Sequence, residues 1–453
     1  MLTKEENELL THVGPGTPCG ELLRRYWWPA CFASELTDEN PKQRVKIMHE
    51  ELMIFRDTQG NYGCVAEHCA HRGVSLYYGF VEDCGVRCAY HGWKYATADG
   101  RCLEQPFEPQ GSSYKDRVRQ RAYSVQKLGG VLWVYMGPGP APLLPRWDVL
   151  AREGGLRKLL RWPVLSCNWM QVVENSADVT HTYFLHGHTL HQQGVRGVQV
   201  DYYYRPIRQF GFQPFEWGLL KSWAYVGTGG PLGDETGGGN PLIFPASLRV
   251  LEHPWHAMHF RVPIDDTTTR FFWVGHLANP DLASPMLRAH CAPDCLACER
   301  IIAGEPQDPE NPLVHDMPPQ YADDGEYPLN GFFNQDRMAF ETQGALLDRS
   351  EEHLGASDRG IVLYRQMLRQ QIEVVQAGGD PLGVIRDPAK NQLIEVPVWV
   401  ADVDAEAVAA QGGGRPVGAT MDEVFDERHE VFTVDPSGQP SYRAPVSSTQ
   451  PKV

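Results

Sequence analysis

Short hydrophobic runs separated by turn residues fill the chain between residues 43 and 140. These runs read as strands, at 44–49, 51–57, 62–67, 93–97 and 131–137. They predict a small antiparallel β domain. A proline-rich stretch at 138–147 follows and is expected to act as a linker, because repeated prolines stiffen the chain and end regular structure.

A different pattern begins after the prolines. Apolar positions recur at helical spacing from about 168 to 186, and longer alternating segments follow at 198–205, 219–227, 245–252, 256–264 and 269–277. A last strong helix is predicted over 358–378, with Gly378 as its stop. Near the start, Thr3 and Glu6 have the spacing of a capping box for a first helix.

The pattern predicts an α+β protein with two domains and a tail. Residues 1–150 are expected to hold N-terminal helices and the β domain, and residues 151–400 a second domain with an antiparallel sheet and a long C-terminal helix. Residues 401–453 read as an acidic C-terminal extension, because the helical periodicity fades there.

The net charge and the lack of long apolar runs limit the kinds of partner that the chain is expected to bind. The 453 residues carry a net charge of -16, which argues against nucleic acid and suits a basic protein partner. No apolar run approaches the roughly 20 residues of a membrane span, and the acidic start lacks the features of a secretory signal. We therefore expect no membrane contact and a cytoplasmic location.

Two Cys/His pairs lie within the predicted β domain. Cys69 and His71 form one pair, and Cys88 and His91 follow sixteen residues after the first. A tetrahedral zinc is one reading, although zinc fingers usually group Cys with Cys and His with His. One thiolate and one imidazole from each loop suit a [2Fe-2S] cluster with two thiolates on one iron and two imidazoles on the other.

At this point the sequence resembles the Rieske family. The segments CAHRG and CAYHGW match its C-x-H and C-x2-H motifs, and Val74 and Tyr90 stand where respiratory Rieske proteins carry a disulfide. The oxygenase branch therefore fits better. The resemblance extends from GPGTPCGELLRRYW to the helix after LDRS and is strongest to the phthalate-dioxygenase-like branch, which implies a helix-grip catalytic domain and a mononuclear Fe(II).

The second predicted site lies in the apolar stretch 168–186. His181 and His186 would be about 140° apart on a regular helix, so the helix must be distorted or end there if both bind one metal. His188 lies on the same face as His181 but about 10 Å along the axis. The resemblance favours His186, because Rieske oxygenases carry D-x2-H-x4-H with both histidines as iron ligands.

The third ligand must come from elsewhere in the chain. Asp336 is the preferred donor, because NQDRMAFETQG resembles the run that supplies the carboxylate in this branch, and Glu341 is the competitor. Asp178 is expected to orient His181 and, by the resemblance, to bridge to His91 of a neighbouring subunit. Asn175 lies in the same stretch as a further catalytic candidate.

Three other features stay open or are set aside. Arg205 and Arg208 are candidates to bind a substrate carboxylate, although strand alternation would put them on opposite faces. The glycine-rich stretch 227–240 is expected to be a flexible loop. Cys291, Cys295 and Cys298 lack the βαβ context of a radical-enzyme cluster and read as an inert insertion or, with His290 or His315, a structural zinc site.

The resemblance implies the oxygenase component of a multi-component system. It would take electrons from a separate NAD(P)H-dependent reductase, with or without a ferredoxin, and form a homotrimer or a multiple of one. The leading expectation is oxidative O-demethylation of a methoxylated, lignin-type aromatic acid. Ring dihydroxylation of a phthalate- or benzoate-like acid is the alternative, and an electron carrier without oxygenase activity is the alternative of another class.

Overall fold

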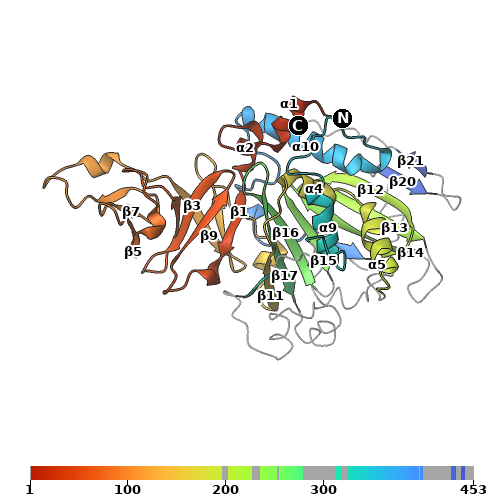
Figure 1. The fold of residues 1–453 in the computed structure, drawn as a ribbon, viewed down its shortest axis with the longest axis horizontal. Helices are drawn as coiled ribbons and strands as arrows, with labels where there is room; N and C mark the ends of the chain where they lie inside the picture. Colours follow the sequence, from red (N-terminus) through yellow and green to blue (C-terminus); the bar gives the residue numbers. More distant parts are fainter. Residues whose placement is uncertain are drawn as a thin grey trace.

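The computed structural model describes residues 2–195, 203–226, 235–252, 255–278, 312–317, 325–396, 398–400, 430–434 and 440–443. Two small sheets lie at one end of the molecule and one large sheet lies at the other, with helices over the large sheet (Figure 1). This arrangement agrees with the predicted α+β class.

The small end is the predicted antiparallel β domain. Its six-stranded sheet has the order β1-β10-β9-β4-β3-β2, from strands β1 (Trp27–Phe32), β2 (Lys42–Ile47), β3 (Glu50–Arg56), β4 (Tyr62–Ala66), β9 (Ala122–Leu128) and β10 (Val131–Tyr135). The four-stranded sheet has β5 (Phe80–Glu82), β6 (Gly85–Arg87), β7 (Lys94–Ala96) and β8 (Cys102–Glu104) in sequence order.

The large sheet has the order β18-β11-β17-β16-β15-β14-β13-β12-β20-β21, and β19 pairs with β14. Its strands are β11 (Leu156–Arg161), β12 (Ile207–Phe215), β13 (Gly218–Val226), β14 (Glu235–Ile243), β15 (Ser247–Glu252), β16 (Trp255–Pro263), β17 (Thr269–Leu277), β18 (Leu313–Asp316), β19 (Trp399–Val400), β20 (Glu430–Val434) and β21 (Pro440–Arg443). All of these pairs are antiparallel except β11 with β18.

Two sequence predictions about this sheet were wrong. The stretch 227–240 was expected to be a loop, but residues 235–243 form β14 and pair with β13 along its whole length, where neighbouring strands override the low strand preference of glycine. In the segment 198–205 the described residues 203–205 are not in a strand, and β12 begins only at Ile207, after Pro206.

The helices are α1 (Lys4–Thr11), α2 (Pro18–Leu23), α3 (Asp148–Ala151), α4 (Trp169–Ser176), a π-helix (Thr182–His188), α5 (Thr189–Gln192), α9 (Phe332–Glu341) and α10 (Arg359–Gln376). Short 3-10 turns occur at Ala33–Glu35, Leu76–Tyr78, Tyr114–Arg117, Ala356–Asp358 and Pro388–Lys390. Within the described ranges, no helix combines the length and apolar character needed to cross a membrane.

Helices α1 and α10 form as the sequence predicts. The capping box of α1 is present, with Thr3 Oγ1 accepting from Glu6 N and Thr3 N donating to the Glu6 carboxylate. Helix α10 lies over the large sheet (Figure 1) and buries Tyr364, Leu368, Ile372 and Val375. These residues recur with Ile361 at three- and four-residue steps in the sequence, but Ile361 is only partly buried. The helix ends before Gly378, whose φ of 83° is favourable for glycine.

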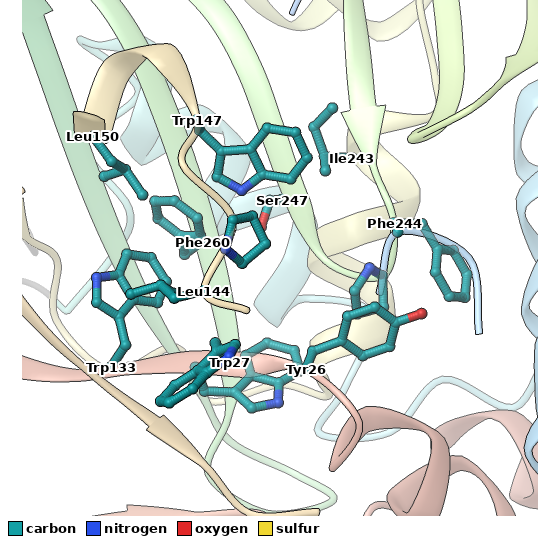
Figure 2. A pocket seen from close by; sticks show the side chains of 14 residues that line it. Tyr26, Trp27, Trp133, Leu144, Trp147, Leu150, Ile243, Phe244, Ser247 and Phe260 are labelled. Atoms are coloured by element: carbon teal, nitrogen blue, oxygen red, sulfur yellow. The ribbon is translucent and has the colours of Figure 1, made fainter. Parts of the chain in front are cut away.

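An aromatic junction joins the small end to the large sheet. Trp27 and Trp133 from the small end face Phe260 of β16 and Trp147 of the connecting segment around a cavity of about 50 Å³ (Figure 2). The Trp133 and Phe260 rings meet edge to face, with centroids 5.0 Å apart. Buried ring contacts of this kind fix the orientation of the two parts.

A buried ion-pair cluster holds the helices over the large sheet. Glu174 of α4 accepts from Arg349 Nη2 at 2.7 Å and from Arg365 Nε of α10 at 2.6 Å, and Arg349 Nη1 donates to Asn7 Oδ1 of α1 at 3.1 Å. Burial raises the pKa of Glu174, but the two guanidinium charges outweigh it and hold the pKa below its usual value. The stabilisation is therefore present at neutral pH and is lost on acidification.

We predict that Glu174→Gln lowers the melting temperature, because it leaves the buried guanidinium of Arg349 without a carboxylate and removes one of the two carboxylates that pair with Arg365, at about 3–5 kcal/mol. The matched control is Glu6→Gln, which removes the pair with Arg369 in which the side chains are 34% and 40% exposed and is expected to change stability by less than about 1 kcal/mol. Differential scanning calorimetry measures both variants. Equal shifts in melting temperature would contradict the proposed role of the cluster.

Candidate metal centres

Asp178 interrupts the helical segment that carries the two predicted histidine ligands. Its carboxylate accepts from Thr180 N at 2.7 Å and His181 N at 3.2 Å, so it caps a new turn just after α4 ends at Ser176. The π-helix follows at once. Because a π-helix closes i→i+5 hydrogen bonds, residues five apart approach one face, which brings His181 and His186 together. The predicted distortion is confirmed.

The Nε2 atoms of His181 and His186 both point toward Asp336 of α9. They lie 4.0 Å and 3.4 Å from Asp336 Oδ1, and the three ligand atoms all lie within 4.8 Å of one another. In the part of the chain that the structure describes, no other group of three or more His, Cys, Asp or Glu side chains converges in this way. Two imidazoles and one carboxylate on one side of an ion fit a non-haem Fe(II) with open positions.

The competing ligands have other roles. Glu341 accepts hydrogen bonds from Ser166 N, Tyr327 Oη and Arg337 Nε, at 2.8, 2.7 and 3.1 Å. Its carboxylate therefore holds α9 in place and does not join the histidines. His188 lies in the π-helix but outside the three-residue group.

Each histidine is oriented by a hydrogen bond from its Nδ1–H. His181 donates to Asp178 Oδ2 at 3.0 Å, as predicted, and His186 donates to Gln335 Oε1 at 2.8 Å. Both bonds leave Nε2 free to bind a metal. Asn175 Nδ2 donates to Asp336 Oδ1 at 3.3 Å. Gln335 was not predicted, and the only local signal is its position directly before Asp336.

The electrostatics keep both carboxylates ionised. Burial raises the pKa of Asp336, but the charges of His186 and His181 outweigh it, and the pKa falls below its usual value. Burial also raises the pKa of Asp178, but the hydrogen bonds from His181 and Thr180 have the larger effect, so the pKa of Asp178 lies below its usual value. An anionic Asp336 beside two imidazoles is the donor set that a divalent cation requires.

The two Cys/His loops have the same backbone design. Cys69 O accepts from Gly73 N and Cys88 O from Gly92 N, while each cysteine N donates to the residue that follows its glycine. Gly73 and Gly92 both have a φ of 74°, which a residue with a Cβ adopts only under strain. The two loops therefore share one backbone geometry, and each carries one Cys/His pair.

The side chains in these loops fit a two-iron cluster better than a single zinc. Cys69 and Cys88 are buried, the rings of His71 and His91 lie 4.8 Å apart, and buried His91 Nδ1 has no hydrogen-bond partner. These four side chains are not among those that converge on one point, as one tetrahedral ion would require. Tyr95 Oη lies 3.1 Å from Cys69 Sγ, and Trp93 stacks on His71 at 4.1 Å.

The other arginine, cysteine and histidine residues considered as site candidates do not join either metal centre among the described residues. Arg205 is buried ahead of β12 and Arg208 is exposed on it, so the structure does not present the two as a pair. Cys64 and Cys102 are buried as expected of core thiols, whereas Cys84 is exposed. His290, Cys291, Cys295 and Cys298, the side chain of His315, and most of the extension 401–453 lie outside the described residues.

Comparison with known proteins gives two family matches. Residues 26–121 match a Rieske [2Fe-2S] domain, and residues 244–399 match a LigXa C-terminal domain like family. The chain is 36% identical over 422 residues to the 5,5'-dehydrodivanillate O-demethylase oxygenase subunit of Sphingobium sp., covering 91% of this chain and 90% of the relative.

Two further oxygenases are similar to this chain, one in sequence and one in fold. The phthalate 4,5-dioxygenase oxygenase subunit of Pseudomonas putida is 31% identical over 404 residues, covering 84% of this chain and 89% of its own. The terminal oxygenase of carbazole 1,9a-dioxygenase from Nocardioides aromaticivorans has the same fold, with a TM-score of 0.56 at 20% identity, covering 81% of this chain and 96% of its own.

We predict that Gln335→Leu weakens iron binding about 10- to 100-fold, because His186 loses the acceptor that fixes its ring. The matched control is Gln343→Leu, an exposed glutamine just beyond α9. Iron retained during dialysis against a chelator, measured per chain, reads out the effect, while the visible absorbance of the cluster should not change. Equal retention of mononuclear iron in the two variants would show that Gln335 does not orient His186.

Proposed function

Because this chain belongs to the Rieske non-haem iron oxygenases, we propose that it is the oxygenase component that O-demethylates a methoxylated aromatic acid. The family is an oxidoreductase family with a Rieske [2Fe-2S] cluster and a mononuclear iron. The relatives are oxygenase subunits, which does not support the electron-carrier alternative. We assign the cluster to Cys69, His71, Cys88 and His91, and the iron to His181, His186 and Asp336.

When bound, the cluster supplies electrons one at a time and the mononuclear iron binds O2 and activates it beside the substrate. The protein's own groups set the geometry. Asp178 and Gln335 fix the two imidazoles through their Nδ1–H groups, and Asn175 donates to the carboxylate of Asp336. These bonds fix the ligand atoms before substrate enters, which is the condition for a site with open positions.

The choice of reaction rests on the relatives. The Sphingobium relative is an O-demethylase, and it aligns with 91% of this chain at 36% identity, whereas the phthalate 4,5-dioxygenase relative aligns with 84% at 31% identity. Demethylation consumes O2 and two electrons and releases the methyl carbon as formaldehyde. Ring dihydroxylation, the alternative supported by the phthalate 4,5-dioxygenase relative, places both oxygen atoms on the ring and releases no formaldehyde.

Oxygenase subunits of this family work in multi-component systems with separate electron donors. We propose a separate NAD(P)H-dependent reductase, with or without a ferredoxin, and a homotrimer or a multiple of it. One observation supports a subunit assembly: β5 and β7, which flank the cluster loops, lie at the far end of the molecule from α4 and α5, which flank His181 and His186 (Figure 1). Electrons would then reach the iron from the cluster of a neighbouring subunit, past Asp178.

We predict that the purified chain, supplied with a compatible reductase, consumes O2 and releases formaldehyde in equal amounts with a methoxylated aromatic acid such as 5,5'-dehydrodivanillate. His181→Ala should abolish both and lose the mononuclear iron while keeping the visible spectrum of the cluster. His188→Ala is the control and should keep its iron. O2 uptake without formaldehyde across a panel of aromatic acids would favour dihydroxylation instead.

We also predict that Asp178→Asn keeps both metals but slows electron transfer from cluster to iron. The asparagine side chain lacks the negative charge that pairs with His181. Its NH2 group cannot accept the hydrogen bond that His181 Nδ1–H donates to Asp178 Oδ2. Stopped-flow measurement of cluster reoxidation in a single turnover reads the rate directly. If the cluster of Asp178→Asn is reoxidised at the wild-type rate, Asp178 does not take part in electron transfer.

A further inference from the structure

Two buried cationic side chains lie beside the proposed iron site, and neither has an acidic hydrogen-bond partner among the described residues. Arg261 of β16 is 3% exposed and Lys221 of β13 is 6% exposed. Neither forms an ion pair with any residue that the structure describes. Burying an unpaired charge is strongly unfavourable, so a position of this kind needs an explanation.

Arg261 is held by contacts that leave most of its donors free. Its Nη2 donates to Ser176 Oγ of α4 at 2.6 Å, and its guanidinium lies over the Phe271 ring at 5.2 Å. Its Nε and Nη1 are buried and have no hydrogen-bond acceptor. Ser176 directly follows Asn175, which donates to Asp336, so the free donors lie close to the proposed iron ligands.

Two carboxylates, Asp336 and Glu252, lie near enough for their charge to raise the pKa of Arg261. Both already have other hydrogen-bond or ion-pair partners. Asp336 faces His181 and His186, and Glu252 accepts from His259 Nε2 at 2.7 Å and Trp273 Nε1 at 2.8 Å. None of the residues that the structure describes therefore supplies an anion for the free side of the guanidinium.

Lys221 adds a second positive charge to the same region. Its Nζ donates to the backbone oxygen of Asp178 at 3.1 Å, next to the turn that carries His181. Burial, together with the nearby charge of Arg261, lowers the pKa of Lys221 to about 8, although the charge of Asp178 acts in the opposite direction. At neutral pH most of the population remains protonated, so two like charges share one buried region.

We infer that Arg261, assisted by Lys221, binds the carboxylate of the aromatic substrate. A guanidinium with free Nε and Nη1 donors pairs with a carboxylate in a defined plane, and the Phe271 ring beneath it excludes water. A carboxylate fixed here orients the ring relative to His181, His186 and Asp336. The inference rests on the proposed function for the identity of the ligand and replaces Arg205 and Arg208 as the carboxylate clamp.

The test compares an acid with its neutral analogue on the metal-loaded protein under anaerobic conditions. Isothermal titration measures the dissociation constants of 3-methoxybenzoate, 3-methoxybenzamide and 5,5'-dehydrodivanillate for the wild type, Arg261→Gln, Arg261→Lys and the control Arg208→Gln. Arg261→Gln should weaken binding of the acids about tenfold to a hundredfold and leave the amide unchanged. Arg261→Lys should be intermediate, and Arg208→Gln should match the wild type.

A stability measurement separates ligand binding from a structural role. Without ligand, Arg261→Gln should melt at or above the wild-type temperature, because it removes an uncompensated buried charge, and it should lose the stabilisation that the acid gives the wild type. A clear drop in the melting temperature of the free variant would identify a structural residue and overturn the inference. So would equal loss of acid and amide binding, or a wild type that binds neither acid.

The outcomes also distinguish this inference from the proposed function. Acid binding that depends on Arg261 in a protein that releases no formaldehyde would uphold the clamp and reject the demethylation. Formaldehyde release with acid affinity unchanged in Arg261→Gln would uphold the demethylation and reject the clamp.

Discussion

The contact of His181 and His186 with Asp336 is the constraint on which the rest of the catalytic end depends. The ligands come from segments about 150 residues apart, so α9 must be held firmly against the end of α4. Gln171 of α4 does this by donating to Phe340 O and Gly344 O and by accepting from Leu347 N. These bonds hold α9 against α4 and so support the arrangement in which the three ligand atoms lie within 4.8 Å of one another.

Local features of both sites could be predicted from the sequence, and distant contacts could not. The spacing of Cys69, His71, Cys88 and His91 lies within one short stretch, and helical geometry alone required a distortion between His181 and His186. The form of that distortion, a π-helix begun by Asp178, depends on hydrogen bonds that spacing does not reveal. The partner of His186 comes from α9, and only folding makes Gln335 its neighbour. Strand β14 was missed because its glycines are ordered by β13 and not by their own preference.

The aromatic junction bears on the proposed transfer of electrons between subunits. The small end packs against β16 through the large buried rings of Trp27, Trp133 and Trp147 (Figure 2). This rigid contact holds the cluster loops well away from α4. A flexible linker would let the small domain swing toward its own iron site. A fixed one instead favours transfer between subunits, since a neighbour can present its cluster at a constant distance from Asp178.

The buried arginines divide into two kinds, and the contrast carries functional meaning. Arg349 donates three hydrogen bonds to Glu174, and Arg365 donates one to Glu174 and two to Glu352. These contacts show how the protein neutralises a guanidinium that has a structural role. Arg261 of β16 lies against Ser176, at the end of the helix that carries Glu174, and its only hydrogen-bond partner there is the Ser176 hydroxyl. Folding stability alone would not retain such a residue, because a neutral side chain of similar size would be less unfavourable there. The uncompensated charge is best explained by an anion that arrives after folding, and an aromatic carboxylate is the anion that the proposed reaction supplies.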